Sequence, residues 1–246
     1  MKILLIRPNK NEGDKQALEA QGFDVQIDPY LTITQVDNPE GAQKMLEALS
    51  KPGRKWLLAT STNAMDYWQR QLPENALQEA ITNAKDLHFG AIGSQTKSIL
   101  EAFGARDIII PKNNNGASLA EQLAETEPAT VIQPAGSIAM KDIPNTLEPI
   151  GFEMITEVVY ATEAVTETPD SVSQIENNEF DAVLFRSPSA ARAFFKFNPE
   201  PNLKLISAGK TTAKQLASLG YPADLVIERP DPEAIAEAIN KWSQND

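Results

Sequence analysis

Cysteine is absent from the 246 residues of this chain, and histidine occurs only once. The first absence excludes disulfides, thiolate metal sites and a cysteine nucleophile. The single histidine, His88, lies in "DLHFGAIG" at the edge of an apolar run, without a recognisable set of partner residues. We therefore expect an ordinary packed or exposed histidine, and neither a histidine-rich metal site nor a Ser-His-Asp triad.

Long apolar runs and an excess of positive charge are also missing. No apolar run approaches the ~20 residues of a membrane span, and "MKILLIRPNK" reaches Arg7 too soon for a secretory signal. The formal net charge of −12 argues against nucleic-acid binding, which needs a basic face, but it is compatible with an anionic ligand in a locally basic cleft. We expect a soluble, cytoplasmic protein with no membrane or nucleic-acid partner.

One stretch, "SAGKTTAKQL" (residues 207–216), contains the letters of a nucleotide-binding loop. Such a loop needs a second glycine five residues before the Gly-Lys pair, so that it can wrap around phosphates. Lys204 occupies that position, and the apolar "LKLIS" leaves too short a loop. What remains is a strand, a tight glycine turn and a helix start at Thr211 and Thr212, whose free backbone N–H groups suit any anion, carboxylates included.

Short apolar runs alternate with amphipathic helical stretches along the chain. The runs are typical of buried parallel strands: "ILLIRP", "WLLATS", "HFGAIG", "DIIIP", "TVIQPAG", "DAVLFRS", "LKLISAG" and "DLVIE". Stretches such as "ASLAEQLAE", "AARAFFKF" and "PEAIAEAIN" lie between them. This alternation predicts an α/β fold of βαβ units, with helices on both faces of parallel sheets.

The chain also repeats itself. "AIGSQTKSILEAFGARDIIIP" matches "SAGKTTAKQLASLGYPADLVIERP", which pairs Gly93 with Gly209, Thr96 with Thr212, Leu100 with Leu216 and Gly104 with Gly220. "LLATSTNAMDYW" matches "VLFRSPSAARAFF", and a looser pair joins the segments around "ILLIRPNK" and "VIQPAG". Because the order of these units is shifted between the halves, we expect two similar domains, one inserted in the other: residues 1–35 plus 168–246, and residues 36–167.

Two crossings join these domains, "YLTITQVDN" and "VVYATEAVTE". In both segments apolar and polar residues alternate, and Thr, Val and Tyr are frequent. They are therefore expected to pair as a two-stranded antiparallel ribbon. A bare ribbon of this kind is only marginally stiff. Hinge motion and a cleft between the domains are therefore expected.

In open parallel sheets, ligands bind beyond the carboxyl ends of the strands. Small and hydroxyl-bearing residues stand at these ends: Thr60, Ser61, Thr62, Asn63, Gly93, Ser94, Gly136, Ser137, Ser187, Ser189, Gly209, Thr211 and Thr212, together with Arg7 and Lys210. Helix capping is one explanation, because Ser, Thr and Asn are preferred caps. The other is a surface that holds the carboxylates of a polyanion on helix N-termini and favours chemistry that depends on positioning more than on proton transfer.

Six segments in order, "ILLIRP", "TSTNA", "AIGSQTKSILEAFG", "EVVYAT", "FRSPSAARAFF" and "AGKTTAKQLASLG", resemble the uroporphyrinogen-III synthase family over nearly the whole chain. The resemblance implies the two-domain, ribbon-linked architecture and a lyase of porphyrin and haem biosynthesis. Its substrate would be hydroxymethylbilane, a linear tetrapyrrole that is cyclised with loss of water and inversion of ring D. No cofactor or metal is implied.

The same resemblance implies roles for individual residues. Tyr160 matches the family's linker tyrosine and would donate a hydrogen bond to the departing hydroxyl; a buried structural tyrosine is the alternative. Arg7, Arg186 and Lys210 would offset substrate charge, although Arg7 could instead pair with a local acid. The substrate's carboxylates would be held by Thr60, Ser61, Asn63, Gly93, Ser94, Thr96, Gly136, Ser187, Ser189, Gly209, Thr211 and Thr212.

One departure from the family concerns the loop after "TVIQPAG", where a glycine is often flanked by basic residues. Gly136 fits, but Pro134, Ala135 and Met140 are not basic, and Lys141 follows one position later. Electrostatic help from this loop is therefore the least secure part of the match.

The resemblance also implies a monomer whose transient partner is the upstream deaminase that forms the bilane. Two other functional classes stay open at this point. One is a two-domain protein that closes on an anion or a tetrapyrrole without chemistry. The other is a nucleotide-dependent enzyme.

Overall fold

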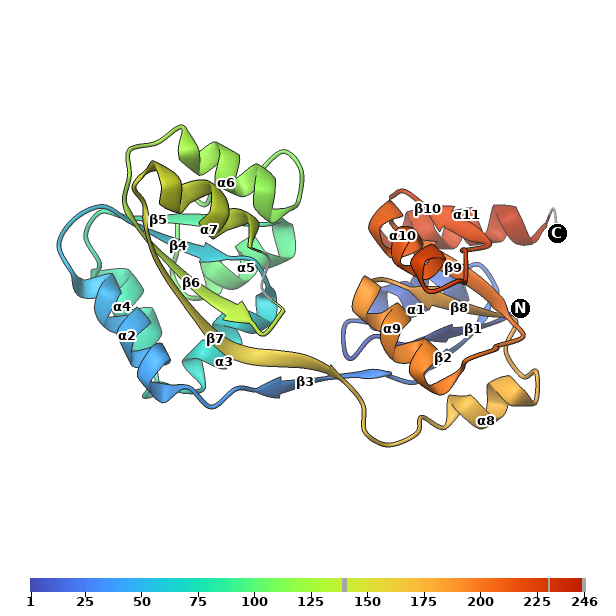
Figure 1. Cartoon of the computed structure of the whole chain (residues 1–246). Coiled ribbons are helices and arrows are strands. Elements are labelled where there is room, and N and C mark those ends of the chain that lie inside the picture. The colour runs from blue at the N-terminus through green and yellow to red at the C-terminus, as the bar shows by residue number, and fades with distance from the viewer. Residues whose placement is uncertain (139–140, 230, 245–246) are drawn as a thin grey trace. The chain divides into compact units, whose positions relative to one another are not determined.

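The computed structural model describes residues 1–138, 141–229 and 231–244. It divides into two compact units, Met1–Ile33 with Glu163–Asp246, here called the outer domain, and Thr34–Thr162, the inserted domain (Figure 1). Each unit is an α/β domain built on a mainly parallel sheet, so the predicted fold class is confirmed. The chain passes from one unit to the other a few residues earlier, at both crossings, than the sequence pattern suggests.

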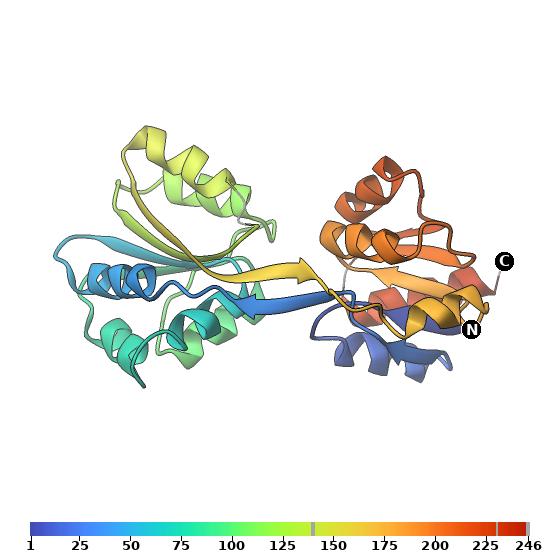
Figure 2. The same cartoon turned by 60° about the horizontal axis from the view of Figure 1, so that its bottom comes forward.

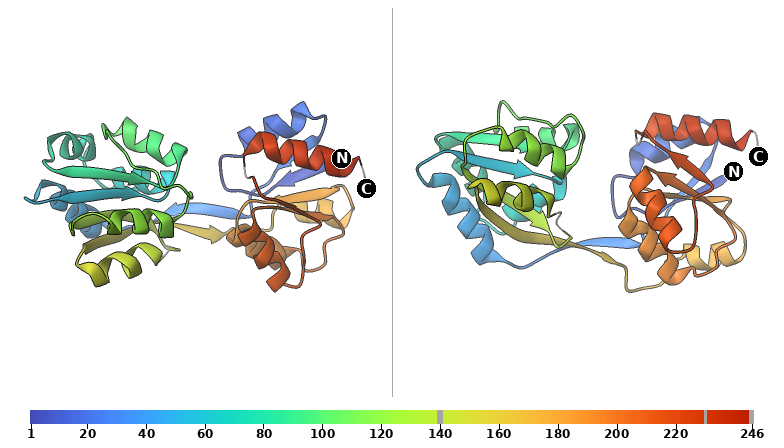
Figure 3. Two further views of the ribbon diagram at one scale, coloured as in Figure 1. Left: turned by 90° about the horizontal axis from the view of Figure 1, so that it is seen from above. Right: turned by 45° about the horizontal axis from the view of Figure 1, so that its top comes forward.

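The outer domain has a five-stranded sheet in the order β10-β9-β8-β1-β2, in which each strand is parallel to its neighbours. The strands are β1 (Lys2–Leu5), β2 (Asp24–Ile27), β8 (Ala182–Phe185), β9 (Lys204–Ala208) and β10 (Leu225–Ile227). The helices are α1 (Glu12–Ala20), α8 (Ser171–Glu176), α9 (Pro188–Phe197), α10 (Lys210–Ser218) and α11 (Pro232–Ser243). Helices α1 and α11 cover one face, while α9 and α10 cover the other (Figure 3).

The side chains of β1 point alternately to the two faces of the sheet, and this explains why helices cover both faces. Ile3 and Leu5 pack in the cluster that includes Leu18 of α1, whereas Leu4 packs in the cluster that includes Phe194 of α9. Successive side chains of a strand point to opposite faces, so a run of four apolar residues needs helices on both sides.

The inserted domain has the strand order β3-β7-β6-β4-β5. Its strands are β3 (Leu31–Gln35), β4 (Lys55–Ala59), β5 (Leu87–Ala91), β6 (Thr130–Gly136) and β7 (Glu153–Ala164). Its helices are α2 (Pro39–Ser50), α3 (Thr62–Gln69), α4 (Ala76–Asn83), α5 (Ser94–Ala102), α6 (Gly116–Ala124), α7 (Asp142–Leu147) and the single 3₁₀ turn η1 (Glu148–Ile150). Helices α6 and α7 cover one face, and α2 to α5 cover the other (Figure 2).

The two sheets repeat the same spatial order of related strands. β9, β8, β1 and β2 in the outer sheet correspond to β5, β4, β6 and β7 in the inserted one. The paired helix-start glycines, Gly93 and Gly209, both have positive φ angles, 134° and 104°. The paired leucines, Leu100 and Leu216, are both fully buried. The internal duplication with shifted chain order, predicted from the sequence, is therefore confirmed.

One predicted strand is wrong. The segment "DIIIP" forms only an isolated parallel bridge between Gly90 and Ile109. Asp107 has a φ of 51°, outside the extended region, and Pro111 has no N–H to donate. Of the three residues between them, only Ile109 pairs with β5, so within the described residues this edge of the inserted sheet lacks a strand equivalent to β10 of the outer sheet.

The crossing strands pair as predicted, with one difference. Val36 N donates to Val159 O at 3.1 Å and Val165 N to Tyr30 O at 3.1 Å, a pattern that fits antiparallel β3 and β7. β7 is longer than expected, however, because its first part pairs parallel with β6 as far as Tyr160. The ribbon is thus anchored in the inserted sheet and is not a free two-stranded element. None of the helices in the described part of the chain has the length and apolar character needed to cross a membrane.

Candidate functional site

The predicted site residues lie where the chain leaves the carboxyl ends of the strands. In the outer domain they follow β1, β8 and β9 and form what we call the outer edge: Arg7, Arg186, Ser187, Ser189, Gly209, Lys210, Thr211 and Thr212. In the inserted domain they follow β4 and β5 or lie on β6 and β7, forming the inserted edge: Thr60, Ser61, Asn63, Gly93, Ser94, Thr96, Gly136 and Tyr160. The parallel registers place each group along one edge of its own sheet.

His88 lies outside both groups. It stands near the amino end of β5, in register with Trp56. Its Nε2 lies 3.0 Å from Asp86 Oδ1, and its ring centroid lies 5.0 Å from that of Trp56. His88 is thus partly exposed, a position that fits the prediction of an ordinary packed or exposed histidine.

Two glycines begin the helices α5 and α10. Gly93 and Gly209 have φ angles that residues with a Cβ rarely adopt, and within the described part of the chain no side chain caps either helix start. The first N–H groups of these helices, together with the positive end of each helix, suit an external carboxylate. The following residue is exposed in both cases: Ser94 in α5, and Lys210 in α10, whose Nζ lies 2.7 Å from Glu228 Oε1.

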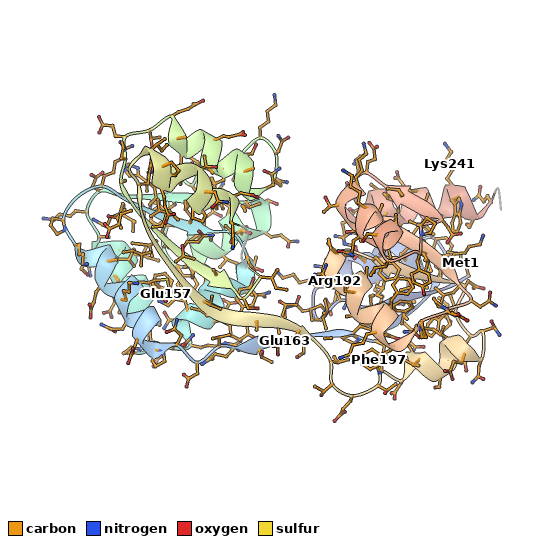
Figure 4. The ribbon with its side chains drawn as sticks, viewed as in Figure 1. Met1, Glu157, Glu163, Arg192, Phe197 and Lys241 are labelled. Carbon is orange, nitrogen blue, oxygen red and sulfur yellow. The ribbon has the colours of Figure 1, made fainter. Side chains whose placement is uncertain are left out.

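The two serine-started helices behave differently, because their serines cap them. Ser61 Oγ accepts from Asn63 N at 3.2 Å, and Ser187 Oγ accepts from Ala190 N at 3.2 Å. Ser187 Oγ also lies 3.0 Å from Ser189 Oγ. For these serines helix capping, the alternative explanation, is realised, so any contact with a ligand would come in addition to the cap. Arg192 of α9, labelled in Figure 4, donates to Gln215 of α10 at 2.8 Å and links the two helices of this edge.

The paired threonines of the duplication are almost fully covered. Thr96 is 8% exposed and Thr212 is 3% exposed, each at the third position of its helix. Burial leaves little of either side chain to touch a ligand, so their direct role in binding stays a prediction. Thr60, Asn63 and Gly136 are half-buried, and Thr211 is exposed.

A buried acid joins the two arginines of the outer edge. Asp14, in the first turn of α1, has its Oδ2 3.7 Å from Arg7 Nη1 and its Oδ1 3.3 Å from Arg186 Nη1. Only 2% of the Asp14 side chain is exposed. Arg7 therefore does pair with a local acid, and the acid is shared with Arg186. Asp14 could not be recognised as a site residue from the sequence, because acidic residues are common in the first turn of exposed helices.

Burial is the largest influence on the charges of this cluster. It raises the pKa of the Asp14 carboxyl, while Arg186 and Arg7 act in the opposite direction. Burial also lowers the pKa of Arg7, Arg186 lowers it further, and Asp14 and Glu12 oppose this. Because a guanidinium has such a high ordinary pKa, Arg7 stays charged although its pKa is lowered.

Tyr160 is held between β6 and α3. It lies opposite Gly136 in the register, at a bulge between Ala135 and Gly136. A Cβ at Gly136 would stand 2.6 Å from Tyr160 Cζ, so the ring lies directly on the glycine. The ring also stacks on Tyr67, with centroids 5.8 Å apart and an angle of 23° between the planes. Arg70 stands over the Tyr67 ring, 4.6 Å from its centroid.

A sequence model of one protein family, described as uroporphyrinogen-III synthase HemD, matches residues 14–237. The chain belongs to the uroporphyrinogen-III synthase family. It is similar to the uroporphyrinogen-III synthase of Chlorobaculum parvum, with 25% identity over 249 residues, 97% of this chain and 98% of that protein. It is also similar to the porphyrin biosynthesis protein HemD of Ruminiclostridium josui, with 26% identity over 223 residues, 87% of this chain and 43% of that protein.

Solved uroporphyrinogen III synthases share the fold. A mutant enzyme from the extremely thermophilic bacterium Thermus thermophilus has 15% identity and a TM-score of 0.63, with 100% of both chains covered. The synthetase from Helicobacter pylori has 17% identity and a TM-score of 0.60, with 98% of this chain and 99% of that chain covered. The predicted family, and with it a cyclising enzyme of porphyrin biosynthesis, is confirmed.

The structure describes only part of the loop after β6, where this chain departs from the synthase family. Met140 lies outside the described residues. The loop begins with Ser137, whose N–H donates to Tyr160 O at 2.9 Å, so its start is tied to the tyrosine strand. Lys141 is exposed at the start of α7.

Proposed function

We propose that this member of the uroporphyrinogen-III synthase family cyclises hydroxymethylbilane to uroporphyrinogen III, and that the outer and inserted edges hold the substrate's carboxylates. The main support is the pair of uncapped helix starts at Gly93 and Gly209, one on each edge. Arg7 and Arg186 add positive charge to the outer edge of a chain whose formal net charge is −12.

The reaction requires positioning more than acid–base power. The bond to the terminal hydroxyl breaks, and the hydroxyl leaves with a proton as water, which generates an electrophilic azafulvene. Ring D attacks it through its substituted carbon, and the spiro intermediate then breaks one bond and recloses with ring D inverted and a proton released. Since the pyrroles supply the electrons, the protein's task is to fold the chain and assist the departing hydroxyl.

Tyr160 is the group we assign to the departing hydroxyl. Its phenolic O–H is a hydrogen-bond donor, and the contacts of its ring with Gly136 and Tyr67 fix its direction. The serine and threonine hydroxyls of both edges, and the N–H groups at Gly93 and Gly209, would hold acetate and propionate groups.

The proposal includes a cytoplasmic monomer that receives its substrate from the deaminase that forms the bilane. The bilane closes to the type I isomer without help. A transient contact between the two proteins would therefore shorten the time in which this side reaction competes.

A coupled assay tests the activity. Hydroxymethylbilane is generated with and without the protein, the products are oxidised, and the type I and type III porphyrins are separated. We expect type III to dominate with the protein and type I without it. Type I alone, from protein shown to be folded, would contradict the proposal. Binding of uroporphyrin III by that same protein would then favour a tetrapyrrole-binding protein without catalysis.

A further inference from the structure

The fold brings Arg186 to Arg7 and Asp14, which lie far from it in the sequence. β1 and β8 are parallel neighbours, with Leu5 opposite Leu184, so the residues that follow them emerge side by side. Helix α1 begins soon after β1 and places Asp14 within ion-pair distance of both guanidiniums. The three side chains form one cluster at the outer edge.

This cluster has unused hydrogen-bonding capacity. Among the described residues, Asp14 meets Arg7 and Arg186 at ion-pair distance, but neither Asp14 oxygen nor the buried Arg186 Nη1 has a partner in good hydrogen-bond geometry. One acid stands between two guanidiniums, so basic groups outnumber acidic groups within the cluster. An ion pair that serves only stability is expected to satisfy its buried atoms. A ligand carboxylate would give the Arg186 Nη1 donor an acceptor, whereas the Asp14 oxygens, which are acceptors themselves, would need a donor such as water.

Arg7 is already fixed before any ligand arrives. Its Nη1 donates to Lys10 O at 3.2 Å, and its own carbonyl accepts from Asn11 Nδ2 at 3.0 Å. A fixed guanidinium loses little freedom when it binds a carboxylate, which is the benefit of preorganisation.

We propose that Asp14 is a positioning residue that, through Arg7 and Arg186, shapes a binding point for one carboxylate of the tetrapyrrole. This inference rests on the proposed function. Asp14 separates two like charges that would otherwise repel each other, and leaves the other N–H donors of each fork for the substrate. Two further charged groups act on the cluster, Glu12 on Arg7 and Glu233 of α11 on Asp14, and both are exposed.

The test is Asp14→Asn, which keeps the shape of the side chain and removes its charge. We expect the KM for hydroxymethylbilane to rise about fivefold with kcat within about twofold, the signature of lost uniform binding. The Kd for uroporphyrin III, measured by fluorescence quenching, should rise by a similar factor. The melting temperature should not fall, since burial already disfavours the ionised carboxylate.

Glu12→Gln is the matched control, because it removes the same charge from an exposed position in the same helix turn. Its KM and Kd should stay within about twofold of wild type, as expected for a screened surface charge. Unchanged KM and Kd in Asp14→Asn would overturn the proposal. A joint loss of kcat and melting temperature would do the same, since it indicates a structural role.

Should Asp14→Asn fail to fold, Arg186→Lys decides the matter. It keeps the positive charge but loses the planar fork. A folded Arg186→Lys variant with wild-type KM and Kd would contradict the proposal. If the wild-type protein made type I porphyrin alone, the proposed function would fail, whereas the uroporphyrin III affinities of the variants would still decide the role of Asp14.

Discussion

The ring of Tyr160 occupies the space that a side chain at position 136 would fill. A Cβ on Gly136 would lie 2.6 Å from Tyr160 Cζ and 2.9 Å from its hydroxyl oxygen, closer than Cβ atoms approach other atoms in real proteins. Gly136 is therefore required for the position of the tyrosine ring, whatever else it contacts. The bulge in β6 at this point is consistent with such a local adjustment.

Gly136→Ala should move the Tyr160 ring and lower kcat by roughly tenfold, because small misplacements of a positioned group have large effects. We also expect a loss of about 1–3 kcal/mol in the free energy of unfolding, from overpacking. Both are measured by the isomer assay and by urea unfolding. In a Tyr160→Phe background the same substitution should lower kcat much less. Equal losses in both backgrounds would show that Gly136 does not act through the tyrosine.

Tyr160→Phe should lower kcat on the order of a hundredfold, because it removes the donor to the departing hydroxyl and keeps the ring. The stack on Tyr67 survives, so the melting temperature should change little. Ser94→Ala, an exposed site on the same edge, is the comparison, and its kcat should stay within about threefold, since many hydrogen bonds share the work of binding. A loss for Tyr160→Phe no larger than for Ser94→Ala would remove the assignment.

Lys55 offers a test at the opposite end of the inserted sheet. Its side chain is 2% exposed, and its Nζ donates to the carbonyls of Lys51, Gly53 and Lys85 at 2.6, 2.7 and 3.0 Å. Lys55→Met would leave these carbonyls without their donor, and we expect a loss of about 1–3 kcal/mol in the free energy of unfolding. The kcat and KM at 25 °C should stay at wild-type values. Lys55 begins β4, whereas the predicted site residues follow the other end of this strand.

Lys51→Met, at an exposed position in the same turn, is the control for Lys55→Met and should change stability by no more than about 0.5 kcal/mol. Thermal unfolding and the isomer assay, run on both variants, make the comparison. A loss of activity in Lys55→Met at a temperature where it is folded would contradict the separation between the two ends of the sheet.

The pH dependence of stability should reveal Asp14. Its pKa is raised by burial, so the folded protein binds this proton more tightly than the unfolded chain, whose aspartates titrate near pH ~3.9. Its favourable contribution is therefore fully present below that pH and is lost as the pH rises through the folded-state pKa. The stability of wild type relative to Asp14→Asn, from urea unfolding, should fall as the pH rises above about 4. A rise over this range would show that the arginines outweigh burial.

The sequence predicts the repeated parts of this molecule well and its contacts poorly. Gly93 and Gly209 could be paired because both halves keep the same local turn, and local turns leave a pattern in the chain. Asp14 could not be found in this way. Its burial follows from the adjacency of β1 and β8, and the residues that come after these strands are far apart in the sequence.

The same reason explains the other differences. The contact between Tyr160 and Gly136 depends on the register of β6 and β7, which a one-residue slip would abolish. The strand predicted at "DIIIP" is apolar enough, but the backbone conformation of Asp107 and the missing N–H of Pro111 limit its pairing. Apolar periodicity reports burial and says little about which hydrogen bonds are available.

The chain enters and leaves the inserted domain through two neighbouring segments. Tyr30 and Val165 of the outer domain are joined by a backbone hydrogen bond, and the five strands of the outer sheet lie wholly outside the insertion. Removing the insertion would leave two chain ends about one strand spacing apart, roughly 4.8 Å. A tight turn could close that gap without breaking the outer core. In evolutionary terms, a circularly permuted copy of the ancestral gene could have been inserted into the gene for the outer domain at a single site. Such an insertion would leave both hydrophobic cores intact.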